Sequence, residues 1–417
     1  MVLRNRLILT LPIVGYFAVF YKSTWLPGNK FFLNTSFYIV ILFTIVTFLF
    51  FVDFSIVESK FRLFKRENRI FILLAAVFLI SSFVFNPGEF KSVYYTSFYL
   101  AYIFNFLIYF IIVPILIINN KDLFYKMLYA ISFFSLSFSL IGVLFLFLGV
   151  ATEVRFVGKV TSIMVHPNFV PSVTLIGLFS TLLIIHITHK SQLNKKVFFL
   201  ISFLIQFLAL FLSYARDGMI AFVAGLGVFY FLTYRKYFLY TLPLSIVIVP
   251  LFIFEFVKSK GFISFFSRFL LLIPAYYLLI SDKVRLLWGY GASNATDMYV
   301  KYKIMYNILE DVNSPHNAYI SYVLMYGLIF TIIFLYFIFS ILFKGAKYVW
   351  KNEDHNEKVI VSAFISTSIA YLVINLFESH LAMAHLTMMH PFLLFLGLLF
   401  FSLKNQSFLK YFNESRS

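Results

Sequence analysis

The sequence predicts an all-α fold, a bundle of helices that crosses a membrane many times. Of the 417 residues, 62% are hydrophobic and only 12% are charged, and the mean hydropathy is +0.92. A soluble domain carries about a quarter charged residues. Apolar segments long enough to cross a bilayer also recur along the whole chain. We therefore expect a single transmembrane domain over residues 1–417.

The first element resembles a secretory signal peptide, because Arg4 and Arg6 precede an apolar run. It lacks a small-x-small cleavage motif, so we interpret it as the first spanning helix. Twelve spans are predicted in all, with no internal repeat. They are Leu7–Tyr21, Thr35–Val52, Ile70–Phe85, Tyr94–Ile118, Met127–Val150, Phe169–Ile187, Val197–Leu212, Met219–Thr233, Phe238–Phe256, Ala318–Phe343, Val359–Phe377 and Pro391–Leu403.

The charge distribution predicts how these spans are oriented. In a soluble protein a net charge of +17 would suggest a nucleic-acid partner. Here Lys and Arg on the cytoplasmic side of a membrane explain much of it, so no nucleic acid is expected. With both termini in the cytoplasm, the segments on that side hold twenty-one of the 34 Lys and Arg residues, and the short outer loops hold few.

A long outer loop, Val257–Pro315, lies between the ninth and tenth spans. It contains an apolar run, Phe262–Ile280, that Arg268 interrupts. If this run were a thirteenth span, the basic cluster Lys344–Lys358 would lie outside, against the positive-inside rule. We therefore expect an interfacial or re-entrant helix there, within a functional cap on the outer face.

The strongest candidate for acid–base chemistry is His316, at the mouth of the tenth span. Pro315 precedes it, and Asn317 is a good N-cap for the helix that follows. A neutral imidazole at a membrane–water boundary can accept a proton or orient a hydroxyl, although an interfacial histidine satisfied by water is the alternative. Tyr319 and Trp288 are candidates for stacking on sugar rings.

Arginines gather on the same predicted face. Arg216 lies in a very short turn between two spans, where it must snorkel, pair with Asp217 or bind a ligand. Arg155, Arg268 and Arg285 lie in outer loops, and each alone could equally be a solvated or headgroup-binding charge. Several arginines beside a histidine fit a phosphate or pyrophosphate better, because guanidinium donates bidentate hydrogen bonds and stays charged.

The sequence excludes several other chemistries. It has no cysteine, which removes thiol catalysis, disulfides and thiolate metal sites. There is no P-loop and no H-E-x-x-H motif. His380, His385 and His390 are interleaved with methionines, but a spacing of five does not place them on one helical face. We predict no metal and no cofactor.

Four short motifs resemble the superfamily of bacterial O-antigen polymerases and O-antigen ligases. The first is His316-Asn317, nine residues, then Gly327, which resembles a ligase pattern but has Phe330 where that pattern has Gly, Thr or Tyr. The second is Ser213–Gly218, with Arg216 in its middle. The third is the Gly-x-Gly turn in Trp288–Gly291, and the fourth runs from Arg155 through His166-Pro167-Asn168. Their order and common side of the membrane are more specific than any one motif.

The resemblance implies a glycosyltransferase in the bacterial inner membrane with its active face in the periplasm. Its substrate would be an oligosaccharide on undecaprenyl pyrophosphate, within membrane lipid, and a chain-length regulator is a further conceivable partner. Arg216 with Arg285 or Arg268 would hold the pyrophosphate, and His316 would be the general base. We favour a polymerase. Ligation to lipid A-core is the first alternative, and a flippase, which needs ionisable groups deep in its spans, is the second.

Overall fold

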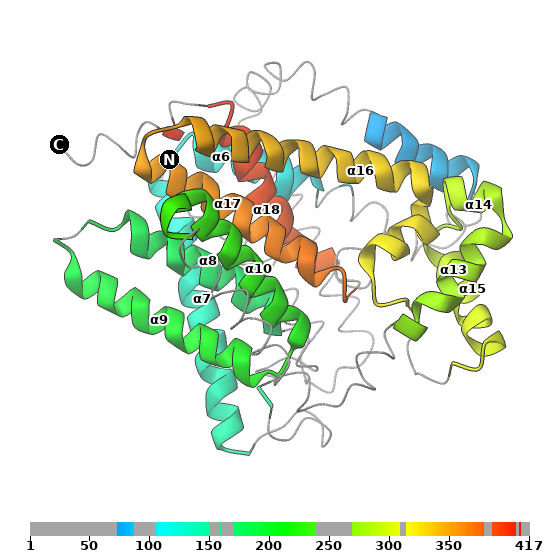
Figure 1. Cartoon of the computed structure of the whole chain (residues 1–417), viewed down its shortest axis with the longest axis horizontal. Coiled ribbons are helices and arrows are strands. Elements are labelled where there is room, and N and C mark those ends of the chain that lie inside the picture. Colours follow the sequence, from blue (N-terminus) through cyan, green and yellow to red (C-terminus); the bar gives the residue numbers. More distant parts are fainter. Residues whose placement is uncertain are drawn as a thin grey trace, which may run out of the picture.

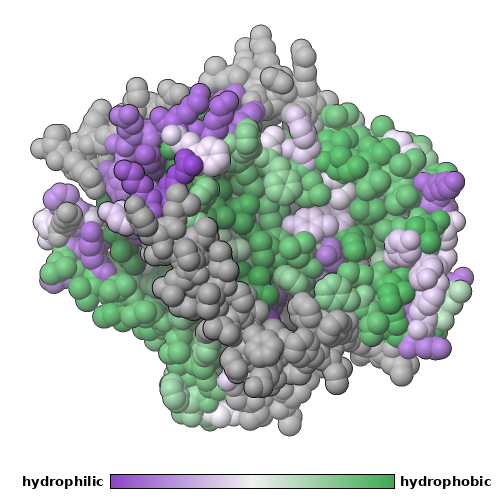
Figure 2. Space-filling view, viewed as in Figure 1, coloured by the Kyte–Doolittle hydropathy of each residue, from purple (hydrophilic) through white to green (hydrophobic). Residues whose placement is uncertain are grey.

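The computed structural model describes residues 73–86, 103, 106–149, 159–160, 170–189, 191–238, 269–308, 314–378, 386–405 and 408–409. Within these ranges every regular element is a helix (Figure 1). The all-α prediction is confirmed for this part of the chain. Figure 2 shows that most of the described surface on one face is hydrophobic, as expected for a protein surrounded by lipid.

Six of the described helices are long and apolar enough to cross a membrane. This indicates a membrane protein, and each of the six coincides with a predicted span. They are α7 (Lys121–Phe147), α8 (Val170–Ile187), α9 (Leu193–Leu212), α10 (Arg216–Thr233), α16 (Ala318–Lys351) and α17 (His355–Ile374).

Shorter apolar helices fall in three further predicted spans. They are residues 73–79 continuing into η2 (Ile80–Val84), η4 (Phe106–Ile112) continuing into α6 (Val113–Ile118), and α18 (Leu386–Ser402). The predicted spans Leu7–Tyr21, Thr35–Val52 and Phe238–Phe256 lie outside the described residues, or nearly so. The total of twelve spans therefore stays a prediction.

The centre of the bundle is formed by α8 and α17, whose apolar stretches are largely buried by other helices. α10 packs along α17, while α7 and α9 flank α8 on the outside. Small residues permit the close approach of these backbones, as is usual between membrane helices. A Cβ at Gly225 of α10 would lie 2.9 Å from the carbonyl oxygen of Ser366 in α17.

A buried polar cluster links α7, α8 and α9. The hydroxyls of Ser132 and Thr181 are 2.6 Å apart, and Gln206 Nε2 donates to Thr181 Oγ1 (3.1 Å) and Ser202 Oγ (3.0 Å). In an apolar surrounding each such group needs a protein partner, so the cluster fixes how the three helices face each other.

The helix α16 is broken at Gly327, which has φ 84° and ψ 168°. The rings of Tyr322 and Phe334 are 5.3 Å apart. Twelve residues along a straight helix would separate them by about 18 Å. The chain therefore doubles back at Gly327, and the expected continuous helix Ala318–Phe343 is corrected to a short segment, residues 318–326, and a long segment, residues 328–351.

The described part of the predicted long loop is itself helical. It contains α13 (Leu272–Ser281), α14 (Lys283–Trp288) and α15 (Ala292–Met305), which lie together at one end of the molecule against α16 (Figure 1). α13 falls in the run Phe262–Ile280, where a helix was expected. The helices α14 and α15 were not anticipated, and residues 257–268 lie outside the described ranges.

Candidate functional site

Several helix ends meet at one end of the bundle. A Cβ at Gly218, in the first turn of α10, would lie 2.3 Å from the side chain of Pro171 at the start of α8. Tyr371, near the end of α17, donates its hydroxyl hydrogen bond to the carbonyl of Ser172. The amide of Ala318 at the start of α16 donates to the carbonyl of Asn375 (3.0 Å) just after α17. Arg216 and His316, which begin α10 and precede α16, are therefore at the same end of the bundle.

His316 forms a pair with Glu378, which follows α17. Its Nδ1 lies 3.0 Å from Glu378 Oε2, and the side chains are 28% and 7% exposed, respectively. A carboxylate at Nδ1 favours the tautomer that carries its proton there, which leaves Nε2 as a hydrogen-bond acceptor. A solvent-accessible base oriented by a buried carboxylate is an arrangement suited to general-base chemistry.

The backbone conformation holds the imidazole in this position. His316 has φ 47°, in the left-handed region that non-glycine residues rarely adopt. Asn317 caps α16, since its Oδ1 accepts from Ile320 N (3.0 Å), and its Nδ2 donates to the carbonyl of Leu376 (2.9 Å). The predicted N-cap is confirmed. Asn317 thus ties the segment carrying His316 to the segment carrying Glu378.

Tyr319 makes a packing contact. Its hydroxyl donates to the carbonyl of Leu372 in α17 at 2.6 Å. The bond joins the first segment of α16 to α17, one turn from the Asn317 contact. This hydrogen bond helps to keep the start of α16, next to His316, against the end of α17, next to Glu378.

Arg216 is the first residue of α10 and is half-buried. The turn before it is tight, because Ser213 Oγ donates to Leu210 O (2.6 Å) and accepts from Ala215 N (3.2 Å). Tyr214 in this turn has φ 55°. Only three non-glycine residues in the described ranges have positive φ, and two of them, Tyr214 and His316, fall in the predicted functional segments. Strained backbone of this kind concentrates at functional sites.

Arg285 fastens α14 to the end of the helix at residues 73–84. Its Nη1 donates to the carbonyl of Phe85 (2.9 Å), to Asn86 Oδ1 (2.7 Å) and to the carbonyl of Gly289 (3.3 Å). Trp288 stacks on Phe85 with ring centroids 4.6 Å apart, so one of its faces is covered. These contacts use a single nitrogen of the guanidinium, and they orient its remaining edge.

The Gly-x-Gly turn at residues 289–291 packs against the break in α16 and forms hydrogen bonds with the backbone there. Tyr290 N donates to Leu324 O (2.7 Å) and Gly291 N to Met325 O (3.0 Å). Gly289 and Gly327 both have φ near 80° with extended ψ, a region that is essentially restricted to glycine. A Cβ at Gly327 would lie 2.1 Å from the carbonyl oxygen of Leu287. Two motifs that the sequence shows far apart are therefore one structural unit.

Tyr290 anchors this unit to α13. Its hydroxyl donates to the carbonyl of Leu278 at 3.0 Å. Burial raises the pKa of Tyr290 above its usual value, so the hydroxyl keeps its proton and remains a donor.

The remaining predicted residues divide into two groups. Arg155, Arg268, His380 and His385 lie outside the described residues. His390 is buried in α18, where it stacks on Tyr109 with centroids 4.1 Å apart. Among the described residues no group of three or more metal-ligating side chains comes together.

Glu378 is the member of this candidate site whose pairing with His316 sequence reasoning missed. The sequence places it on the same predicted face as His316, but no spacing rule joins residues that are 62 positions apart. Only the meeting of the ends of α16 and α17 pairs them.

The fold and this site define a class: a helical membrane protein with a histidine–carboxylate pair and an arginine at one end of its bundle. Comparison of the chain with protein-family models and with curated proteins finds no match.

Proposed function

We propose that this protein is a polysaccharide polymerase of the bacterial inner membrane. It joins oligosaccharide repeat units carried on undecaprenyl pyrophosphate at the periplasmic face, by glycosyl transfer that needs no metal. The observation that carries this proposal is the His316–Glu378 pair, which lies at the same end of the bundle as Arg216. The O-antigen polymerase and ligase motifs quoted above support the substrate class.

In the proposed reaction His316 Nε2 takes the proton from a sugar hydroxyl of the acceptor. The hydroxyl oxygen attacks the anomeric carbon of the donor, while the bond from that carbon to the pyrophosphate oxygen breaks. The pyrophosphate leaves with the bonding electrons, and attack from the opposite face inverts the anomeric centre. Glu378 stabilises the imidazolium that forms, as a carboxylate does for a catalytic histidine.

Arg216 would stabilise the charge that develops on the leaving pyrophosphate. It is permanently charged, half-buried and at the first turn of α10, where the helix dipole also favours an anion. Arg268 and Arg155 are further candidates from the sequence. Arg285 would contribute only through the edge of its guanidinium that the Phe85 and Asn86 contacts leave.

Ligation of a finished chain to lipid A-core is the second candidate. It is favoured by the spacing from His316 to Gly327, which follows the ligase pattern. Gly327 itself has a backbone conformation that is essentially restricted to glycine. Phe330 departs from that pattern, so polymerisation remains the preferred function.

Replacing His316 with alanine tests the function. Loss of a general base lowers rates by about 10²–10⁴-fold, so the cell should show at most a single repeat on its final acceptor and no ladder on a gel. His189→Ala is a matched control, since His189 contacts Ser191 between α8 and α9 at the other end of the bundle, and its ladder should be normal.

Each other outcome has a distinct meaning. A normal ladder from the His316→Ala strain at equal protein level would refute the catalytic role. Long polymer accumulating on the carrier, with a bare acceptor, would identify a ligase. Single repeats trapped on the cytoplasmic leaflet would identify a flippase.

A further inference from the structure

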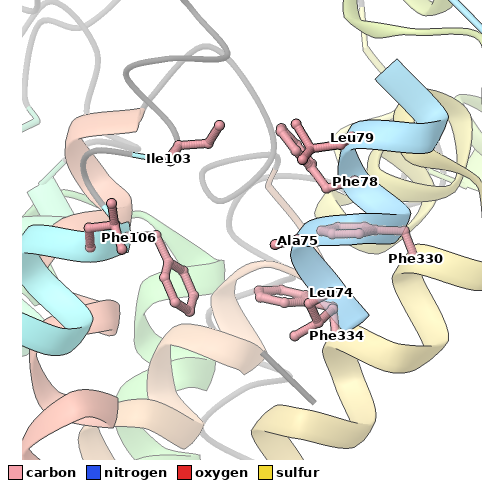
Figure 3. A pocket seen from close by; sticks show the side chains of 9 residues that line it. Leu74, Ala75, Phe78, Leu79, Ile103, Phe106, Phe330 and Phe334 are labelled. Carbon is pink, nitrogen blue, oxygen red and sulfur yellow. The ribbon is translucent and has the colours of Figure 1, made fainter. Parts of the chain in front are cut away.

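An apolar cleft of about 190 Å³ lies between the helix at residues 73–84 and the helix at residues 106–118, and Phe330 and Phe334 of α16 complete its lining (Figure 3). Leu74, Ala75 and Phe78 approach it from one side and Phe106 from the other. Every lining side chain is apolar. Ala75 is exposed, so the cleft reaches the surface of the described residues.

The lining contains Phe330, the residue at which this chain departs from the ligase pattern. Phe330 is buried there and packs parallel to Phe334, with ring centroids 5.8 Å apart. Tyr322, on the segment that begins beside His316, contacts both rings at 6.2 Å and 5.3 Å. The helical segment that follows His316 therefore packs against two of the side chains that line the cleft.

Both helices at the sides of the cleft become π-helical beside it. On one side η2 (Ile80–Val84) follows directly after Leu79, which lines the cleft, and on the other side η4 begins at Phe106. Such turns are rare and occur frequently at functional sites, because they displace side chains from the regular helical positions. This observation is independent of the family motifs.

We propose that this cleft holds a stretch of the polyprenyl chain of the lipid-linked substrate, and that Phe330 shapes it for that chain. The inference rests on the proposed function. A lining without hydrogen-bonding groups selects hydrocarbon, and an apolar cavity of about 150 Å³ is enough to stay dry and bind a benzene ring. The flat, methyl-branched units of a polyprenyl chain can pack against the rings of Phe78, Phe330 and Phe334, which line the cleft.

Photolabelling of the purified full-length protein in detergent micelles tests this. The probe is farnesyl diphosphate with a diazirine at the end of its tail, and adducts are mapped by mass spectrometry. We expect adducts within residues 73–84, 106–112 and 328–334. Ala75→Phe fills the cleft from an exposed position, so it should lower labelling about tenfold or more. Leu73→Trp enlarges a neighbouring side chain that does not line the cleft and should leave labelling unchanged.

Two results would overturn the inference. One is labelling that Ala75→Phe does not reduce. The other is equal competition by unlabelled undecaprenyl phosphate and phosphatidylglycerol, which would assign the cleft to bulk lipid. The labelling needs no catalysis, so either failure leaves the His316→Ala result standing. Conversely, a normal ladder from His316→Ala would refute the polymerase even if the cleft were labelled.

Discussion

At the scale of single residues, the site depends on how His316 is oriented. Its left-handed backbone and the Asn317 cap place Nδ1 beside Glu378. A left-handed backbone is energetically unfavourable for a residue other than glycine, so the surrounding contacts must hold it in place. If the pair were only a packing contact, either partner could be replaced by a residue of similar shape without loss of rate.

Glu378→Gln separates these two roles. The amide keeps the shape of the carboxylate but loses its charge, and its NH₂ group can donate to Nδ1 and so favour the wrong tautomer. We expect the polymerisation rate at saturating substrate to fall by roughly 10²-fold while KM changes little. The measurement is in vitro transfer from a synthetic lipid-linked repeat. A rise in KM alone would assign Glu378 to substrate binding.

Arg216→Lys tests the geometry of the anion site. Lysine keeps the charge but cannot make two parallel hydrogen bonds to a phosphate, so we expect a loss of about tenfold or more in rate. Polymer length on a gel, at equal protein level, is the measurement. If Arg216 serves only to balance Asp217, the lysine variant should give a nearly normal ladder.

At the scale of elements, the break in α16 organises the site. The turn Trp288–Gly291 fits into the break, and Arg285 secures that turn to the helix at residues 73–84. The first segment of α16 then returns to α17 and places His316 beside Glu378. The position of the His316–Glu378 pair therefore depends on a glycine eleven residues after His316.

Gly327→Ala should unfold this arrangement. The conformation is essentially restricted to glycine and costs another residue about 1–3 kcal/mol, and the added methyl also collides with the carbonyl of Leu287. We expect a lower melting temperature in detergent and loss of activity. Gly227→Ala, in α10 with open space at its Cβ, is the control and should be neutral or slightly stabilising. Equal melting temperatures for the two variants would contradict the role of Gly327.

At the scale of the whole molecule, the orientation of the bundle decides whether the site faces the periplasm. The site end and the end where α16 finishes and α17 begins are separated by the length of α17, about 30 Å. That distance matches the hydrocarbon core of a bilayer. The charge bias predicts that the site end lies outside.

Single cysteines test this orientation, because the chain has none of its own. Asp297 in α15 and Glu353 before α17 are both exposed. Asp297→Cys should react with a membrane-impermeant maleimide added to spheroplasts, and Glu353→Cys should react only after the membrane is opened. Labelling of both from the same side would refute the proposed topology.

The sequence by itself determined the class of the protein and most of its described helices. Hydropathy and capping depend on residues close in sequence, so they can be recognised without knowing which helices pack together. Asn317 caps α16 as expected, while α7 begins six residues before the predicted span because Asn120 caps it, with its Oδ1 accepting from Leu123 N (3.2 Å). Helix starts of this kind can be predicted wherever a polar cap precedes an apolar run.

Only the tertiary structure decided what those helices bring together. The pairing of His316 with Glu378, the contact of Arg285 with Phe85 and the cleft in front of Phe330 join residues from about sixty to more than two hundred positions apart. In a membrane, one apolar face resembles another, so hydropathy does not specify which helices meet. Shape does: small residues, a glycine-only break and a few buried hydrogen bonds select the neighbours, and these depend on the folded chain as a whole.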